Sequence, residues 1–381
     1  MSYSNSGTIV QFISGIRDGG AESLVRDYAI MLNQRDIPIV IVTIEPPKLS
    51  SGNYHLLKEA GIKIISVYSR FPLTRVSVIN KLWNRLFYNK YVQFRLKRLF
   101  KELQPRCIHT HLEIIHHLKP LSKFLHNVKL LYTCHSEPNR YFNNSDRKRE
   151  LEAAKYLIKH NNFQCIALHS KMQAELNQIL GVDNTVVIKN GVDFSRYYDV
   201  QLDVAQKREQ EGIPTDAFVV GHIGRFVTTK NHAYLLDVFK RTLAKNDKSH
   251  LLLIGDGPLK ETIQQQIRDC NLEKHVTILS HRSDIPSLLK CMDVFVMPSI
   301  FEGLPVTLVE AQIVGLRCVV SDRITNECFL SDRVVPLNID IDAEVWAQTI
   351  VDTSIKGECS GDISAFNMQN IISELEKMYY N

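Results

Sequence analysis

The regular alternation of two residue patterns constrains the fold of this chain more than any other feature. Short runs of β-branched and other apolar residues alternate with stretches in which apolar residues recur at helical spacing. Residues 37–44 form a nearly continuous apolar run, which is typical of a parallel strand buried on both faces. Residues 21–35 place Leu24, Tyr28 and Met31 on one helical face. Strands that alternate with helices predict a doubly wound parallel α/β sheet.

This alternation occurs in two sets, and 381 residues are too many for one ordinary core. A polar, charged stretch at 199–212 separates the two sets. We therefore predict two Rossmann-like α/β domains that face each other across a cleft, formed by residues 1–195 and 196–365. An apolar face at helical spacing predicts a last helix within 366–381.

Composition narrows the class of protein. Hydrophobic residues make up 44% of the chain and charged residues 23%, as in soluble globular proteins. No apolar run approaches the roughly 18 residues needed to span a membrane, and the N-terminus lacks a secretory pattern, so we expect a cytoplasmic protein. The eight cysteines include no C-x-x-C pair, and the histidines at 109, 111, 116 and 117 lack a metal-ligand pattern. We predict free thiols and no metal site.

Open α/β sheets bind ligands at the carboxyl ends of their strands, so the loops that follow strands deserve the closest reading. One such loop carries Gly224-Arg225 and then Lys230-Asn231, directly before a predicted helix. A planar guanidinium, an ammonium and a helix N-terminus together suit a pyrophosphate. The alternative is two solvated cations on a loop.

A second loop, at 297–311, carries two carboxylates, Glu302 and Glu310, on either side of a predicted helix start at Pro305. Backbone amides near this start would point at an anion, namely those of Gly303, Leu304, Val306 and Thr307. Carboxylates only accept hydrogen bonds, so they suit sugar and ribose hydroxyls better than phosphate. The alternative is that each glutamate is a helix-dipole or surface carboxylate.

The segment Pro298–Ala311 resembles the hallmark segment of the family-four retaining glycosyltransferases, which have the GT-B fold. It reads P-S-x-x-E-G-L-P-x-x-L-x-E-A, with an E-x7-E pair. Further matches are G-G-A-E at 19–22, N-G-V-D at 190–193, G-R and K-N at 224–231, and G-x-G-P at 255–258. The resemblance spans residues 8–335.

The resemblance implies a role for each matching residue. Arg225 and Lys230 would bind the donor pyrophosphate, Glu302 the transferred sugar and Glu310 the ribose. His135 would contact the donor sugar, although a lone histidine after a strand is more often structural. Gly19 and Gly20 match the loop where donor phosphate and acceptor meet, and Arg282 is the candidate for the nucleotide base. The resemblance requires no metal or cofactor, and it implies that the last helix crosses back onto the N-terminal domain.

Residues 70–106 carry ten Lys and Arg and a single acid, Glu102. Aromatic and aliphatic residues recur there at roughly helical spacing, at Trp83, Leu86, Phe87, Tyr91, Phe94 and Leu99. A basic amphipathic helix with aromatics is typical of binding to an anionic membrane surface. An ordinary core-facing helix is the main alternative. Nucleic acid is disfavoured because no nucleic-acid module accompanies the patch.

Together with these features, the resemblance implies a retaining transferase that moves a hexose or N-acetylhexosamine, from a UDP-sugar in preference to a GDP-sugar. The resemblance implies a lipid-diphosphate-linked saccharide acceptor and a place in capsule or exopolysaccharide biosynthesis. The enzyme would then be peripheral on the inner face of the cell membrane. A non-catalytic, membrane-associated nucleotide-sugar-binding scaffold and a sugar-nucleotide epimerase are the alternatives. An epimerase would not be expected to carry the E-x7-E segment.

Overall fold

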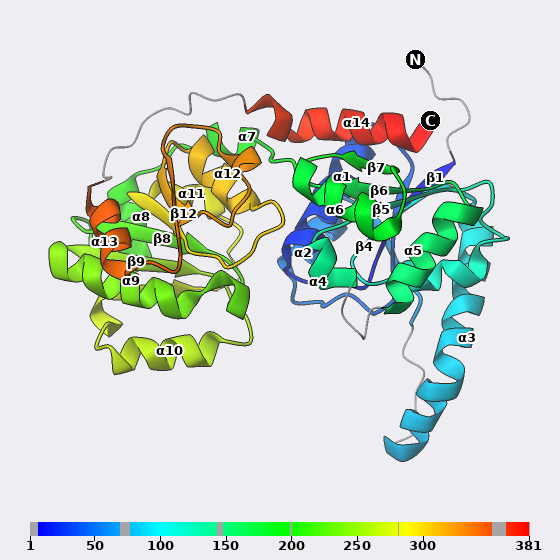
Figure 1. Ribbon diagram of the computed structural model, residues 1–381, viewed down its shortest axis with the longest axis horizontal. Coiled ribbons are helices and arrows are strands. Elements are labelled where there is room, and N and C mark those ends of the chain that lie inside the picture. The colour runs from blue at the N-terminus through cyan, green and yellow to red at the C-terminus, as the bar shows by residue number, and fades with distance from the viewer. Residues whose placement is uncertain are drawn as a thin grey trace. The chain divides into compact units, whose positions relative to one another are not determined.

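The chain divides into two compact units, which we describe separately. The computed structural model describes residues 7–68, 77–142, 148–198, 200–280, 282–352 and 363–380, and for 77–87 and 140 only the backbone. Unit 1 comprises Met1–Lys189 with Ile371–Asn381, and unit 2 comprises Asn190–Asn370. The division falls at 189/190, six residues before the predicted one, since Val192 pairs with Asn367 of unit 2. Figure 1 shows the elements of both units.

Unit 1 contains a seven-stranded parallel sheet in the order β3-β2-β1-β4-β5-β6-β7. Its strands are β1 (Thr8–Ile13), β2 (Ile39–Thr43), β3 (Lys63–Ser66), β4 (Pro105–His111), β5 (Lys129–Thr133), β6 (Phe163–Ala167) and β7 (Thr185–Val187). Its helices are α1 (Gly20–Gln34), α2 (Gly52–Glu59), α3 (Ser77–Leu103), α4 (Pro138–Phe142), α5 (Lys148–His160), α6 (Ser170–Leu180) and α14 (Met368–Tyr380). All five residues of β2 are buried, as expected for a strand covered on both faces.

Unit 2 contains a six-stranded parallel sheet in the order β10-β9-β8-β11-β12-β13. Its strands are β8 (Phe218–Ile223), β9 (Ser249–Ile254), β10 (Val276–Leu279), β11 (Val294–Met297), β12 (Arg317–Ser321) and β13 (Val334–Leu337). Its helices are α7 (Ser195–Tyr198), α8 (Val204–Gln210), α9 (His232–Lys245), α10 (Lys260–Asp269), α11 (Ile285–Lys290), α12 (Val306–Ile313) and α13 (Ala343–Val351). The prediction of two parallel-sheet α/β domains is confirmed.

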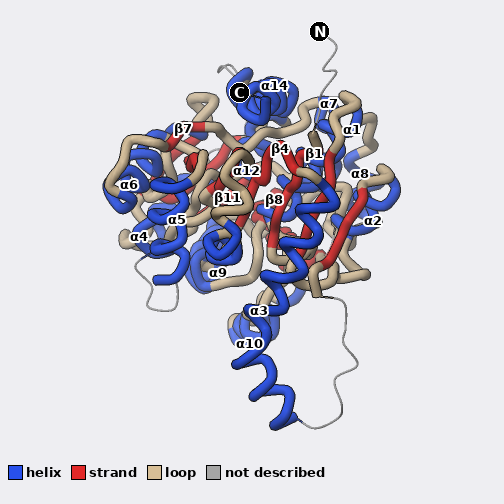
Figure 2. Tube along the Cα trace, turned by 90° about the vertical axis from the view of Figure 1, so that its right-hand side faces the viewer, coloured by secondary structure: helices blue, strands red, loops and turns tan. Residues whose placement is uncertain are grey.

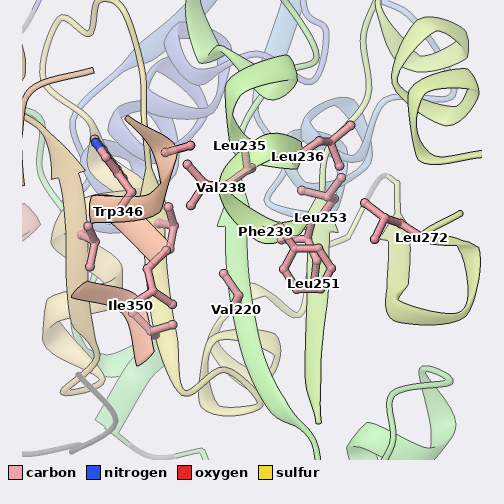
Figure 3. Packing of buried hydrophobic residues seen from close by; sticks show 14 of the residues in the cluster. Val220, Leu235, Leu236, Val238, Phe239, Leu251, Leu253, Leu272, Trp346 and Ile350 are labelled. Atoms are coloured by element: carbon pink, nitrogen blue, oxygen red, sulfur yellow. The ribbon is translucent and has the colours of Figure 1, made fainter. Parts of the chain in front are cut away.

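The core of unit 2 lies between its sheet and the two helices α9 and α13. Helix α9 presents Leu235, Val238 and Phe239 to the strands, and α13 adds Trp346 and Ile350 (Figure 3). All five side chains are fully buried. This packing fixes the start of α9, and with it the loop that leads from β8 into the helix.

Both sheets reverse the direction of strand order at one point. In unit 1 the chain leaves β1 toward one edge and later returns to β4 on its other side; in unit 2, β8 and β11 are related in the same way. Such a switch point leaves a crevice at the carboxyl ends of the two strands, which is where open α/β sheets bind ligands. The loops after β8 and β11 carry Arg225, Lys230 and Glu302.

Helix α3 is anchored to unit 1 through its second half. Val92, Leu96 and Phe100 are buried at a spacing of four residues, and Phe100 meets Phe12 edge to face. Phe94, on another side, is 65% exposed. The ribbon of Figure 1 and the Cα tube of Figure 2 both show the first turns of α3 extending beyond the rest of unit 1. The side chains of Trp83, Leu86 and Phe87 lie outside the described residues.

Helix α14 packs on unit 1, although the preceding residues belong to unit 2. It buries Ile371, Ile372, Leu375 and Tyr379. At its C-terminal end, the guanidinium of Arg106 donates hydrogen bonds to the carbonyls of Tyr379 and Tyr380. Such bonds satisfy carbonyls that the end of a helix leaves without partners.

Candidate donor-binding site

The loop after β8 holds two of the predicted phosphate ligands in different surroundings. Arg225 is exposed, and within the described chain its guanidinium has no hydrogen-bond or ion-pair partner. Lys230 ends a short 3-10 turn, and Asn231 then takes a left-handed conformation, with φ of 56°, before α9 begins at His232. Lys230 therefore stands directly before a helix N-terminus, which favours anions.

The glycine-rich loop after β9, residues 255–258, packs against the backbone of the Arg225 loop. The amide of Phe226 donates to the Asp256 carbonyl at 2.9 Å, and the amide of Leu259 donates to the Phe226 carbonyl at 3.1 Å. A Cβ at Gly257 would lie 2.5 Å from that same Phe226 carbonyl oxygen. The G-x-G-P segment is therefore glycine-rich because the backbone of the Arg225 loop crosses it closely.

An ion pair joins the loops after β8 and β11. Lys230 Nζ donates to Glu302 Oε1 at 2.6 Å, with side chains only 16% and 11% exposed. The Ile300 amide also donates to the Thr229 carbonyl at 2.8 Å. The structure thus brings together two predicted ligands that are 72 residues apart in sequence. An ammonium has three hydrogens, so this bond to Glu302 leaves capacity for a second acceptor.

Four backbone amides beside Glu302 donate no hydrogen bond within the described residues. They are those of Gly303, Leu304, Val306 and Thr307. Helix α12 begins at Val306, with Pro305 as its N-cap, so the last two are first-turn amides. Amides with no internal acceptor at a helix start provide donors for an anion.

Glu310 lies on α12 and is partly exposed. Asn190, from the N-G-V-D motif, is buried, and its side-chain amide donates to the Leu304 carbonyl at 3.5 Å. The motif thereby supports the loop that carries the free amides. Sequence inspection identified the motif but gave no sign of this contact.

Arg282, the candidate for the nucleotide base, is bound to two carboxylates. Its guanidinium donates to both oxygens of Glu211, at 2.7 and 2.6 Å, and to Asp284 at 2.7 and 2.6 Å. Lys207 joins the same carboxylates. The Arg282 guanidinium holds the pKa of Asp284 well below its usual range. This network favours a structural role for Arg282, and base binding stays a prediction.

Two buried histidines near Lys230 were not anticipated from the sequence. His222 Nδ1 donates to the Val296 carbonyl, so Nε2 carries a lone pair, and that atom has no partner in the described chain. A Cβ at Gly224 would lie 3.1 Å from both His222 Nε2 and Lys230 Cε. His232 has no partner at either ring nitrogen among those residues. Burial lowers the pKa of His232 to about 4, so it is neutral at neutral pH.

In unit 1, Gly19 is the N-cap of α1 and Gly20 its first residue. A Cβ at Gly19 would overlap the carboxylate of Glu22, whereas a Cβ at Gly20 would meet no atom within 4 Å. Gly19 therefore lets the Glu22 carboxylate fold over the start of α1. A carboxylate at that position is favoured by the helix dipole.

His135 follows β5 and is partly exposed. Its Nε2 lies 3.0 Å from Nδ1 of His111, on the neighbouring strand β4. Burial lowers the pKa of His135 to about 4 and the pKa of His111 well below its usual range. Both rings are therefore neutral at neutral pH. The sequence offered His111 only as a possible metal ligand, which the absence of a metal-ligand pattern disfavoured. Its contact with His135 is a finding of the structure.

Neither a metal cluster nor a spanning helix is present in the described residues. No group of three or more His, Cys, Asp or Glu side chains there could hold a metal ion. Within the same ranges no helix is long and apolar enough to cross a membrane.

The chain is similar in sequence to known glycosyltransferases. The family profile described as "Glycosyltransferase Family 4" matches residues 18–196, and "Glycosyl transferases group 1" matches 203–334. The putative glycosyltransferase EpsF of Bacillus subtilis is 27% identical, covering 92% of this chain and 88% of that relative. An Escherichia coli enzyme, UDP-Gal:alpha-D-GlcNAc-diphosphoundecaprenol alpha-1,3-galactosyltransferase, is 30% identical over 56% of this chain and 59% of its own.

Among solved structures, Anabaena Alr3699/HepE in complex with UDP and glucose superposes with a TM-score of 0.78. It is 19% identical and covers 98% of this chain and 99% of its own, so this likeness concerns the fold. The two profiles together match most of the chain; the first lies mainly over unit 1 and the second lies within unit 2. With this fold and these relatives, the chain belongs to the family-four glycosyltransferases of the GT-B fold.

Proposed function

We propose that this glycosyltransferase moves a hexose or N-acetylhexosamine from a UDP-sugar to a lipid-diphosphate-linked saccharide, with retention of anomeric configuration, in cell-surface polysaccharide synthesis. One arrangement carries the proposal: the Lys230–Glu302 pair, 2.6 Å long, beside four amides without internal acceptors. It joins donors for phosphate to an acceptor for sugar hydroxyls at the carboxyl ends of β8 and β11.

The relatives support the choice of substrates. The name of the Escherichia coli relative gives UDP-Gal as its donor and a diphosphoundecaprenol-linked GlcNAc as its acceptor. HepE is described in complex with UDP and glucose. Both descriptions favour a UDP-sugar donor over a GDP-sugar here, and the first favours a lipid-diphosphate-linked acceptor.

In the proposed reaction, groups of unit 2 stabilise the negative charge that develops on the leaving diphosphate. The donor pyrophosphate accepts hydrogen bonds from Arg225, Lys230 and the amides that follow Glu302. As the bond from the anomeric carbon to the phosphate oxygen breaks, negative charge grows on that oxygen, and fixed donors stabilise it without reorganising. An acceptor hydroxyl attacks from the same face, and its proton passes to the departing phosphate oxygen. Retention then follows without an enzyme nucleophile, and no metal ion is needed to neutralise the diphosphate.

Glu302 and Glu310 complete the donor site in this proposal. Glu302 accepts from hydroxyls of the transferred sugar, while its bond to Lys230 fixes the ammonium beside the phosphate. Glu310 accepts from the ribose hydroxyls. His135, Gly19 and Gly20 are the unit 1 groups assigned to the donor sugar and phosphate.

Transfer of radiolabel from a panel of UDP- and GDP-sugars into lipid extract tests the proposal directly. We expect one UDP-sugar to label lipid, and Lys230→Ala and Glu302→Ala to abolish the labelling while both variants stay folded. Lys248→Ala, which removes an exposed ion pair with Asp216, is the control and should label normally. Normal turnover in Lys230→Ala would refute the site. UDP-sugar binding with no transfer to any lipid would favour the scaffold hypothesis.

We also propose that α3 attaches the enzyme to the inner face of the membrane. In its described second half, Lys90, Lys97, Arg98 and Lys101 are exposed together with Phe94. Cations and one exposed aromatic suit a surface with anionic headgroups. Arg70 and Arg75 lie outside the described residues.

Co-sedimentation with vesicles that contain anionic phospholipid tests this attachment. Neutralising four cations of α3 should release the protein, namely Lys81, Arg85, Arg95 and Lys97. Neutralising four exposed lysines elsewhere should not, namely Lys123, Lys240, Lys248 and Lys274. If both quadruple variants sediment with the vesicles to the same extent, the cations of α3 do not bind the membrane, and the helix serves only to pack on unit 1.

A further inference from the structure

A continuous series of hydrogen bonds leads from His135 to the last helix of the chain. His135 bonds His111 at 3.0 Å, and His111 Nε2 bonds Gln11 Oε1 at 2.7 Å. Gln11 Nε2 donates to the Tyr379 hydroxyl at 2.9 Å. The series then runs on to His109, 2.8 Å from that hydroxyl, and from His109 to Thr133 at 2.7 Å. We call these six residues the histidine relay.

The relay is enclosed in unit 1. Apart from His135, every member is at most 2% exposed. The rings of His109 and His111 lie 4.2 Å apart, and those of His111 and His135 lie 5.3 Å apart. In the described chain, no carboxylate is hydrogen-bonded to any of the three rings. A charged ring there would lack a counter-ion, so each imidazole is neutral, with one N–H and one lone pair.

Neutral rings give every bond a direction. The Gln11 oxygen can only accept, so His111 Nε2 carries the hydrogen and His111 Nδ1 carries the lone pair. His135 must then donate from Nε2. On the other side, the Gln11 amide donates to the Tyr379 hydroxyl. The hydrogen of that buried hydroxyl needs an acceptor, and His109 Nδ1, at 2.8 Å, is the described atom in position to accept it. All bonds therefore point the same way, from His135 toward Thr133. Turning the Gln11 amide over would reverse all of them.

This direction determines what His135 can offer to a ligand. Because the ring hydrogen of His135 is on Nε2, its Nδ1 atom carries a lone pair. No described residue forms a hydrogen bond with that atom. We propose that Gln11, His111 and Tyr379 are positioning residues, which hold His135 as the Nε2–H tautomer so that Nδ1 accepts a hydrogen bond from a hydroxyl of the donor sugar. This inference rests on the proposed function for the role of His135, but the tautomer itself does not.

The first test measures the tautomer in the protein without substrate. Nitrogen-15 spectra of histidine-labelled protein distinguish Nδ1–H from Nε2–H rings, and loss of one ring signal in His135→Gln assigns His135. We expect the Nε2–H form to predominate. Predominance of Nδ1–H would mean that the relay runs in the opposite direction, and would overturn the proposal.

The second test breaks the relay at a distance from His135. Gln11→Leu and Tyr379→Phe should give His135 a mixture of tautomers. Ser373→Ala is the control, because Ser373 also joins α14 to unit 1, through Arg35 at 3.0 Å, but lies outside the relay. Its spectrum should match that of the wild type. An unchanged His135 signal in Gln11→Leu would show that the relay does not set the tautomer.

The third test separates positioning from a general effect on folding. We expect Gln11→Leu to lower kcat/KM about tenfold, the scale of one lost or reversed hydrogen bond. Combined with His135→Gln, it should lower kcat/KM no further, since Gln11 acts through His135. A further tenfold loss in the double variant would contradict the proposal. Absence of transfer by the wild type would instead contradict the proposed function and leave the tautomer result standing.

Discussion

At the scale of single residues, the most informative contact is the ion pair between Lys230 and Glu302. The sequence assigned the lysine to phosphate and the glutamate to sugar hydroxyls, as independent ligands. In the structure each satisfies the other, with both side chains mostly buried. Removal of one partner therefore leaves the other poorly solvated, so stability and the proposed function are linked at this site.

A double-mutant cycle should reveal this link. We expect Lys230→Met to lower the free energy of unfolding of unit 2 by about 1–3 kcal/mol, because the Glu302 carboxylate loses its cation. The double variant Lys230→Met with Glu302→Gln should lose less than the sum of the single variants. The chain has two tryptophans, and Trp346 is buried in unit 2. Its fluorescence in a Trp83→Phe background reports the denaturation of this unit, and strict additivity would contradict the coupling.

The buried histidines of unit 1 predict a dependence of stability on pH. Burial lowers the pKa of His109 to about 3 and of His135 to about 4, below the ordinary value of 6.5. Below pH 6.5 these histidines become protonated in the unfolded chain, whereas in the folded chain they stay neutral down to about pH 4. Stability should therefore fall as pH drops from 6.5 to 4, by about 1.4 kcal/mol per pH unit for each such histidine.

Hydrogen exchange of peptides from β4 and β5 between pH 6.5 and 4.5 measures this fall, after correction for intrinsic exchange rates. His109→Gln should remove one histidine's contribution to the change of stability with pH. His126→Gln, in the exposed loop before β5, should leave that change as it is in the wild type. A slope that is identical in wild type and His109→Gln would contradict the assignment.

At the scale of elements, a local apolar run is a good predictor of a strand, because a strand covered on both faces must be apolar throughout. Residues 37–44 were predicted as a strand, and β2 spans Ile39–Thr43. β13, Val334–Leu337, was missed because it is short, lies at the sheet edge and contains Pro336. The compact units divide at 189/190 and the predicted boundary is 195/196; the contact of Asn190 with Leu304 leaves no trace in local sequence.

In the candidate site, too, local sequence patterns do not reveal contacts between residues that are far apart in the chain. Spacing within one loop identified Glu302 and Glu310, whose residue types suit hydroxyl ligands. The contacts that orient candidate ligands come from distant elements. Lys230, the partner of Glu302, is 72 residues away from it. In the histidine relay, Gln11 and Tyr379 are 368 residues apart and bond each other. A pattern within one loop can therefore identify a ligand, whereas the network that orients it follows from the fold.

Helix α3 allows a matched comparison of two apolar residues on one element. Leu96 is fully buried and Phe94 is 65% exposed. Leu96→Ala should cost unit 1 about 2–4 kcal/mol, and Phe94→Ala should stay within about 0.5 kcal/mol. Thermal denaturation followed by hydrogen exchange in α3 and β4 distinguishes the two. If Phe94→Ala is as destabilising as Leu96→Ala, the exposed side of α3 is covered by another part of the chain.

At the scale of the whole molecule, the two units repeat one topology but differ in how they are completed. Unit 2 is built from a single stretch of chain, whereas unit 1 takes its last helix from the other end of the sequence. That helix supplies Tyr379 to the histidine relay and Glu376 to an ion pair with Arg35. Completion of unit 1 therefore requires the chain to have passed through unit 2 first.

Removal of α14 tests this dependence. We expect a chain that ends at residue 370, the last residue of unit 2, to lose several kcal/mol of stability in unit 1, because Tyr379, Leu375 and Ile372 no longer cover its surface. Cys107, fully buried beside Tyr379 in the intact protein, should then react with thiol reagents, while denaturation of unit 2 followed at Trp346 stays unchanged. Glu376→Ala, which removes only the ion pair with Arg35, should leave Cys107 protected. Equal protection of Cys107 in the truncated chain would show that unit 1 is stable before its last helix arrives, and that α14 orients the relay without supporting the fold.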